Sequence, residues 1–103
     1  MIEATLFRSG NTYSIDVTGH AGYAPAGSDI ICAAVSALVQ SFAFYCRKTD
    51  GIKVLDDEAS EGMASMVVYG NQSKIDPAYE MLKTGLWEIS LNFPKNILVR
   101  GEK

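Results

Sequence analysis

Histidine and cysteine are scarce in this sequence, which has one histidine and two cysteines among its 103 residues. A structural zinc site uses about four cysteine or histidine ligands, commonly in Cys-x-x-Cys pairs. The chain has no such pair, so we expect neither a metal site nor a cofactor. If Cys32 and Cys46 lie on one helix, they are about 21 Å apart, whereas a disulfide needs about 7 Å. Two free thiols are typical of a reducing compartment.

Basic residues are outnumbered, because 9 lysines and arginines face 12 aspartates and glutamates, for a net charge of −3. No basic run is present that would follow a phosphate backbone, so we expect no direct binding of nucleic acid. The N-terminus lacks the basic start of a signal peptide. The longest apolar stretch, residues 30–45, is interrupted by Ser36, Gln40 and Ser41 and is shorter than the roughly 20 residues of a membrane-spanning helix. We therefore expect a cytoplasmic protein without membrane contact.

The chain length is that of one domain, so we expect residues 1–103 to fold as a single unit. Alternating apolar residues such as Ile2, Ala4 and Leu6 predict strands, and apolar residues three and four positions apart predict helices. The predicted strands cover 2–8, 12–18, 52–58, 63–69 and 96–100, and the predicted helices cover 30–48 and 77–93. This ββαββαβ order predicts an α+β two-layer sandwich, with a largely antiparallel sheet and two helices on one face.

The second predicted helix has clear signals at both ends. Asp76 is expected to cap it and Pro77 to be its first residue, because proline is favoured at that position. Pro94 is expected to end it. Gly85 lies inside this helix, where glycine costs about 1 kcal/mol relative to alanine.

The residues that could carry chemistry lie between Gly19 and Ser36, a segment that includes the single histidine, His20. Cys32 falls in the first turn of the first predicted helix, where free N–H groups and the helix dipole favour a thiolate. A nearby imidazolium would favour the thiolate further. Asp29, Cys32 and Ser36 are three and four residues apart and therefore share one helix face. A polar stripe on an otherwise apolar helix is consistent with a cleft that binds substrate.

Each of these residues also has a purely structural interpretation. Cys32 could pack in the core like a small apolar residue, and Asp29 could only cap the helix. Ser36 could donate to the backbone carbonyl one turn earlier, as serine in helices does. Gly22 and Gly27 could serve only the geometry of a turn. Residue types and spacing alone leave these alternatives open.

A longer pattern combines these residues. It consists of Gly-His-Ala at 19–21, a loop of small residues, and Asp-Ile-Ile-Cys-Ala-Ala-Val-Ser at 29–36. This pattern resembles the bacterial ribosomal-processing cysteine protease family, Prp, and the length and order of elements are similar over essentially the whole chain. The resemblance implies that Cys32 is the nucleophile of a cysteine protease and that His20 is its general base and acid. It implies supporting polar roles for Asp29 and Ser36.

The resemblance also implies a substrate and an assembly. Proteases of this family remove a short N-terminal extension from a large-subunit ribosomal protein, cutting after aromatic residues, and they are homodimers. The expected partners are therefore a ribosomal protein precursor and a second copy of the chain. In such proteases the loop after the histidine moves over the substrate, which makes Gly22 and Gly27 the expected hinges and Tyr23 an expected substrate contact.

Within this interpretation, the backbone N–H groups near residues 29–32 are the expected oxyanion donors. Asp29 could orient His20, as the third member of a triad does, or only cap the helix. Two other functions fit the same segment. One is a non-catalytic ribosome-assembly factor of this fold, and the other is a domain that binds an anion at the helix start.

Overall fold

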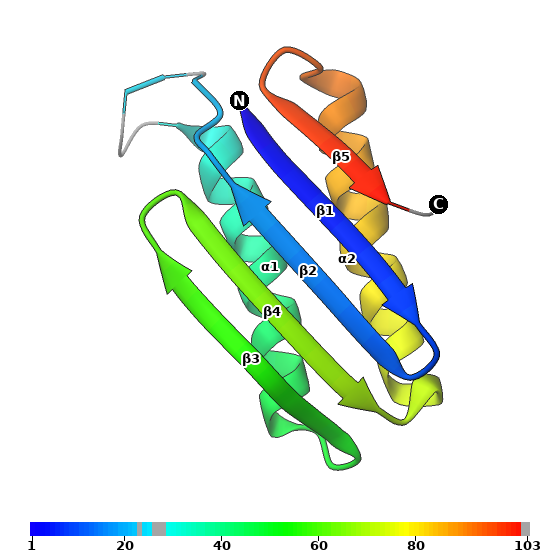
Figure 1. Ribbon diagram of the computed structural model, residues 1–103. Coiled ribbons are helices and arrows are strands. Elements are labelled where there is room, and N and C mark those ends of the chain that lie inside the picture. The colour runs from blue at the N-terminus through cyan, green and yellow to red at the C-terminus, as the bar shows by residue number, and fades with distance from the viewer. Residues whose placement is uncertain (23, 26–28, 102–103) are drawn as a thin grey trace.

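The structure is a computed structural model that describes residues 1–22, 24–25 and 29–101 (Figure 1). One sheet has the strand order β3-β4-β2-β1-β5, in which β1 and β5 are parallel and all other neighbours are antiparallel. Helices α1 and α2 lie side by side on one face of this sheet (Figure 1). The predicted α+β two-layer fold is therefore confirmed. The elements are β1 (Ile2–Ser9), β2 (Thr12–Thr18), α1 (Ile30–Lys48), β3 (Ile52–Ser60), β4 (Met63–Gly70), α2 (Gln72–Asn92) and β5 (Ile97–Gly101).

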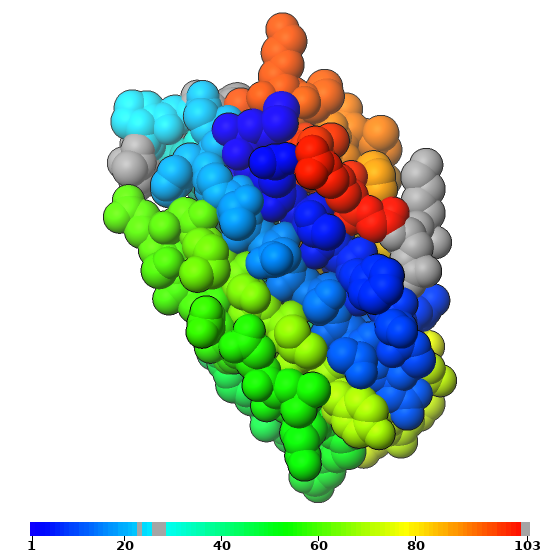
Figure 2. Space-filling model, in the orientation of Figure 1, coloured from blue at the N-terminus to red at the C-terminus, as the bar shows by residue number. Residues whose placement is uncertain are grey.

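The core lies between the sheet and the two helices, where the alternation of each strand turns its apolar residues inward. Each fully buried large apolar side chain contributes about 1.5–3 kcal/mol to folding. The sheet supplies Ile2, Ala4, Leu6, Tyr13, Ile15, Val17, Met66, Val68, Ile97 and Val99, and the helices supply Ile31, Val35, Phe42, Cys46, Ile75, Tyr79, Leu82 and Leu86. The other face of the sheet carries no helix and faces the viewer in Figure 2.

Gly85 allows the two helices to approach each other closely. A Cβ atom at this position would lie 2.9 Å from Cδ1 of Leu38, on α1. Contacts that close are essentially absent from proteins, so a larger residue would require the Leu38 side chain to move. The contact with Leu38 offsets part of the intrinsic cost of glycine within α2.

Helix α2 begins one turn earlier than the sequence predicts. Its N-cap is Asn71, whose side-chain oxygen accepts a hydrogen bond of 3.0 Å from the Ser73 amide. Pro77 therefore lies inside the helix, and the prediction that Asp76 caps it is wrong. The extra turn buries Ile75 completely, and asparagine is as good a cap as aspartate. Burial of Ile75 together with a competent cap outweighs the cost of an internal proline.

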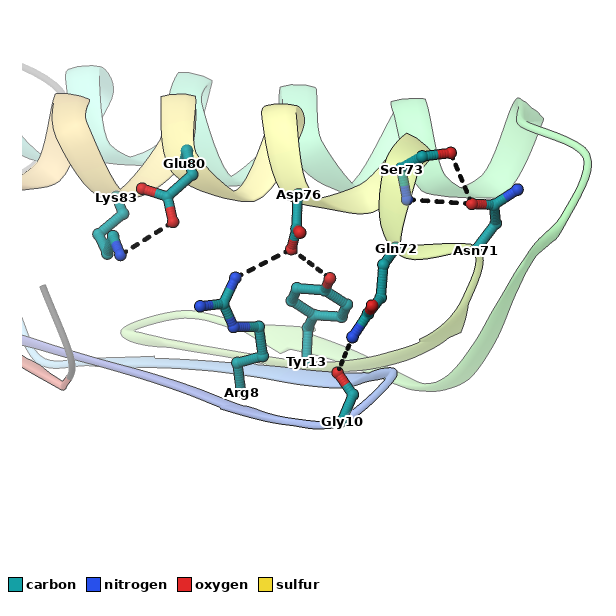
Figure 3. Close-up of polar contacts among 9 residues, drawn as sticks. All are labelled: Arg8, Gly10, Tyr13, Asn71, Gln72, Ser73, Asp76, Glu80 and Lys83. Carbon is teal, nitrogen blue, oxygen red and sulfur yellow. Dashed lines mark hydrogen bonds and ion pairs between the residues drawn. The ribbon is translucent and has the colours of Figure 1, made fainter.

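Asp76 instead links α2 to the first hairpin (Figure 3). Its carboxylate accepts hydrogen bonds from the hydroxyl of Tyr13 and, at 3.0 Å, from the guanidinium of Arg8. Burial, reinforced by the hydrogen bond to Asp76 and its negative charge, raises the pKa of Tyr13 to about 12. The hydrogen bond from Tyr13, helped by Arg8, lowers the pKa of the Asp76 carboxyl. A further bond of 2.7 Å from Gln72 to the carbonyl of Gly10 holds the hairpin turn against the same helix (Figure 3).

Replacing Asp76 by asparagine should make the fold less stable at neutral pH by about 1 kcal/mol, a modest amount because the side chain is 41% exposed. Since folding lowers the pKa of this carboxyl, the stabilisation is complete above the ordinary aspartate pKa of about 3.9 and disappears as the pH falls through the lowered value. Denaturant unfolding of both proteins from pH 7 downward measures the difference.

The matched control is Glu88→Gln, which removes an exposed carboxylate from the same helix, where it takes no part in the cluster of Tyr13 and Arg8. It should change stability less than Asp76→Asn does. A loss for Asp76→Asn that stays constant down to acidic pH would contradict the assigned role of the charge.

Candidate active site

The segment that carries His20 is held against the sulfur of Cys32. The backbone N–H of Ala21 donates a hydrogen bond to Cys32 Sγ, with a distance of 3.4 Å. Cys32 is half-buried in the first turn of α1, and His20 directly precedes Ala21 at the end of β2. The structure therefore brings together the two residues that the sequence identifies as nucleophile and base.

Two more hydrogen bonds fix the backbone on either side of His20. The amide of Gly19 donates to the carbonyl of Gly62 at 2.8 Å, which attaches the end of β2 to the turn between β3 and β4. The side-chain amide of Asn96 donates to the carbonyl of Ala21 at 2.9 Å. Asn96 was not identified from the sequence, because nothing local marks a residue 75 positions away as a partner of Ala21.

Two hollows meet at His20 and Cys32, and both residues line each of them. The first hollow, of about 250 Å³, is walled largely by apolar side chains. The second, of about 500 Å³, has an acidic rim that includes Asp29 and Glu61. An extended peptide that crosses the pair could therefore place one side of its reacting bond in an apolar hollow and the other in a polar one. The first is lined by Ile2, Val17, Gly19, Val35, Ser36, Val39, Ser60, Gly62, Met63 and Ala64, and the second by Gly22, Ala24, Asp29, Ala33 and Glu61.

Asp29 caps α1 with one oxygen and holds the preceding loop with the other. Its Oδ1 accepts from the amides of Ile31 and Cys32, at 2.9 and 3.0 Å, and its Oδ2 accepts from the amide of Ala24 at 3.4 Å. The amide of Ala33 donates to the Asp29 carbonyl at 3.1 Å. Two of the expected oxyanion donors, the amides of Ile31 and Cys32, are therefore engaged by Asp29 in this conformation. The same bonds argue against a domain that binds an anion at the helix start.

Ser36 lies one turn beyond Cys32 and lines the apolar hollow with it. Its hydroxyl accepts a bond of 2.8 Å from the side-chain amide of Gln40, one turn further along α1. Asp29 lines the other hollow. Cys32 therefore lines both hollows, whereas Ser36 lines only the apolar one and Asp29 only the polar one.

The second cysteine provides an internal contrast. Cys46 is fully buried in the core, and this burial raises the pKa of its thiol to about 11 despite the nearby positive charge of Arg47. A thiol in that state is protonated at neutral pH and inaccessible to substrate. Both cysteines are free, as their spacing predicts. Cys32, and not Cys46, is placed to react.

The loop that leads from His20 to α1 is described in part. Gly22 has φ of 69°, a backbone conformation that favours glycine, and it lines the polar hollow. Tyr23 and Gly27 lie outside the described residues, so their expected roles as substrate contact and hinge stay predictions. In the part of the chain that is described, no group of three histidine, cysteine, aspartate or glutamate residues is arranged to hold a metal ion.

Substitution of Asp29 separates its role as a cap from any role of its charge. Asp29→Ala should lower the free energy of unfolding by about 1 kcal/mol, because the amides of Ile31 and Cys32 lose their acceptor. Asp29→Asn keeps a side-chain oxygen and should lose much less, as measured by denaturant unfolding. Equal losses in the two variants would show that the negative charge, rather than the cap, stabilises this end of α1.

The sequence and the fold are similar to those of known proteins. The family model of cysteine protease Prp matches residues 1–98. A crystal structure of the essential ribosomal processing protease Prp from S. aureus, bound to a covalently linked product peptide, is similar with a TM-score of 0.82 at 17% identity, over 99% of this chain and 100% of that one.

A second similar structure is that of SMU.848 from Streptococcus mutans, with a TM-score of 0.73 at 27% identity, over 98% of this chain and 93% of that one. None of the proteins with curated functions matches the chain. Because the family model spans nearly all of the sequence, this protein belongs to the cysteine protease Prp family and is a cysteine protease.

Proposed function

We propose that Cys32 is the nucleophile and His20 the general acid and base of this protease. The observation that carries the proposal is the bond from the Ala21 amide to Cys32 Sγ, because it ties the residue that follows His20 to the sulfur. Both side chains also line the same two hollows, so a bound peptide would meet them together. The alternative interpretation, a cysteine buried in the core, describes Cys46 and not Cys32, which is only half-buried.

The mechanism follows from these positions. The Cys32 thiolate attacks the carbonyl carbon of the scissile peptide bond, and protonated His20 gives its proton to the departing amine, which leaves a thioester. His20 then removes a proton from water, whose oxygen attacks the thioester and releases the acid product and the thiolate. The Ala21 amide, which donates to the sulfur in the free enzyme, would have to leave it to stabilise charge on the attacked carbonyl oxygen.

The substrate that we propose is the precursor of a large-subunit ribosomal protein, from which the enzyme removes a short N-terminal extension after aromatic residues. The family and the similarity to the ribosomal processing protease of S. aureus support this substrate class. The apolar hollow beside Cys32 supports an aromatic side chain next to the scissile bond, since Val17, Val35 and Met63 line it. Two free thiols support a reducing, cytoplasmic location.

Cleavage assays with synthetic peptides test the proposed function directly. Wild-type protein should cut peptides that span the extension of the host's ribosomal protein, with products identified by mass. Cys32→Ala and Cys32→Ser should stay folded and lose cleavage, because neither supplies a thiolate. Cys46→Ala is the control and should retain turnover, because Cys46 lies in the core away from both hollows.

Alkylation distinguishes the protease from a non-catalytic assembly factor. At about pH 6 and low excess of iodoacetamide, Cys32 should be modified in the folded protein while Cys46 is spared, and His20→Ala should slow modification of Cys32. Full cleavage by Cys32→Ala, or equal reactivity of the two cysteines in the folded protein, would refute the assignment.

The homodimer is part of the same proposal. Apolar side chains stay exposed on the helices, including Ile30, Phe44 and Met81, which is 73% exposed. A hollow of about 330 Å³ between α1 and α2, lined by Leu38, Phe42, Tyr45, Pro77, Ala78, Met81 and Leu82 among others, adds to this surface. An apolar surface of this kind is typical of one that a partner covers.

Light scattering at micromolar concentration should therefore give twice the chain mass of 11.2 kDa. Met81→Glu should yield monomers if the helices form the interface, because it would place a charge within an apolar contact. Phe7→Glu is its control on the open face of the sheet, where Phe7 is similarly exposed. A monomeric mass for wild type would contradict the proposal.

A further inference from the structure

The turn between β3 and β4 lies directly against the imidazole of His20. A Cβ atom built on Gly62 would be 2.9 Å from His20 Nε2 and 3.4 Å from Cε1. Real Cβ atoms essentially never approach other atoms as closely as the first of these distances. The imidazole can therefore lie at this position only because residue 62 has no side chain.

The backbone around His20 has little freedom of its own. Gly19 is bonded to the Gly62 carbonyl, and Ala21 is bonded through its amide to Cys32 and through its carbonyl to Asn96. A Cβ on Gly19 would lie 2.3 Å from the backbone oxygen of Met1, the residue before β1, so this segment is also tightly packed. With the main chain held on both sides, the position of the imidazole depends on its side-chain torsions and on what limits them.

The hairpin tip is also where the two hollows meet. Ser60 and Gly62 line the apolar hollow and Glu61 lines the polar one, while His20 and Cys32 line both. A side chain at position 62 would thus displace the imidazole at the boundary that a peptide has to cross. The far end of a side chain moves at low energetic cost, so the displacement would affect chemistry more than folding.

We propose that Gly62 is a positioning residue of the protease: its missing side chain leaves the space in which His20 stands beside Cys32. The proposal rests on the function assigned above to those two residues. A glycine at 62 is also required for the turn, since its φ is 74°. A test must therefore separate strain in the turn from contact with the imidazole.

Gly10 provides the matched control. It occupies the turn between β1 and β2 with φ of 59°, and a Cβ there would meet nothing within 4 Å. Alanine at Gly10 and alanine at Gly62 thus introduce the same kind of backbone strain, and only the second introduces a contact with His20. The two variants should show similar shifts in melting temperature.

We expect Gly62→Ala to lower kcat/KM for the peptide substrate by about a hundredfold, the loss that a displacement of about 1 Å in a catalytic group causes. Gly10→Ala should keep the wild-type value. Because His20 is the single histidine, its imidazole gives one isolated set of proton NMR signals. These signals should shift in Gly62→Ala and stay in place in Gly10→Ala.

If Gly62→Ala does not fold, Gly62→Asn and Gly10→Asn replace the pair, since asparagine tolerates positive φ better and has the same Cβ. Wild-type turnover and unshifted imidazole signals in the folded Gly62 variant would overturn the proposal. Failure of the proposed function has a different signature, namely no peptide cleavage by wild type or full cleavage by Cys32→Ala. In that case the imidazole signals alone still decide whether residue 62 positions His20.

Discussion

The hydrogen bond from the Ala21 amide to the sulfur of Cys32 joins the two segments on which the active site depends. One segment is the end of a central strand, β2, and the other is the start of α1, on the helical layer. Neither segment alone could present the proposed nucleophile together with the proposed base, because Cys32 and His20 are separated by a loop. The fold makes the bond possible by running β2 between β1 and β4, so that its end emerges beside the helix start.

The two ends of the sheet differ in how their polar side chains are used. At the end where β1 turns into β2, the Tyr13–Asp76–Arg8 cluster ties the hairpin to α2 by charge-assisted hydrogen bonds (Figure 3). At the other end, the end of β2, the β3–β4 turn and the start of α1 lie close together (Figure 1), and His20 and Cys32 line the two hollows there. The first end is satisfied internally, whereas the second leaves a thiol and an imidazole facing open space. The polar groups that stabilise the fold thus lie at the opposite end of the sheet from those proposed to react.

Asp29 links the start of α1 to the loop before it. Its Oδ1 accepts from the amides of Ile31 and Cys32, and its Oδ2 accepts from the amide of Ala24. In the proposed reaction, these two helix-start amides and the Ala21 amide, which donates to the sulfur, would each have to leave its present acceptor to reach a charged carbonyl oxygen. The cap therefore holds the backbone of Cys32 in place and ties the preceding loop to the same helix start.

The amino-acid sequence by itself determined the order of elements, the bounds of α1 and the motif that contains His20, Asp29, Cys32 and Ser36. These depend on short-range periodicity, capping and spacing, which are local properties. The start of α2 could not be predicted in this way, because the local preference of Pro77 for a first helical position competes with burial of Ile75 in the core.

Only the tertiary structure decided that Gly62 abuts His20, that Asn96 holds Ala21, and that Asp76 bonds Tyr13. Each of these contacts joins residues far apart along the chain, whose proximity follows from strand order and from packing of the helices on the sheet. Single residues carry no local signal of such neighbours, because a glycine or asparagine in a turn looks the same whether solvent or an imidazole lies beside it.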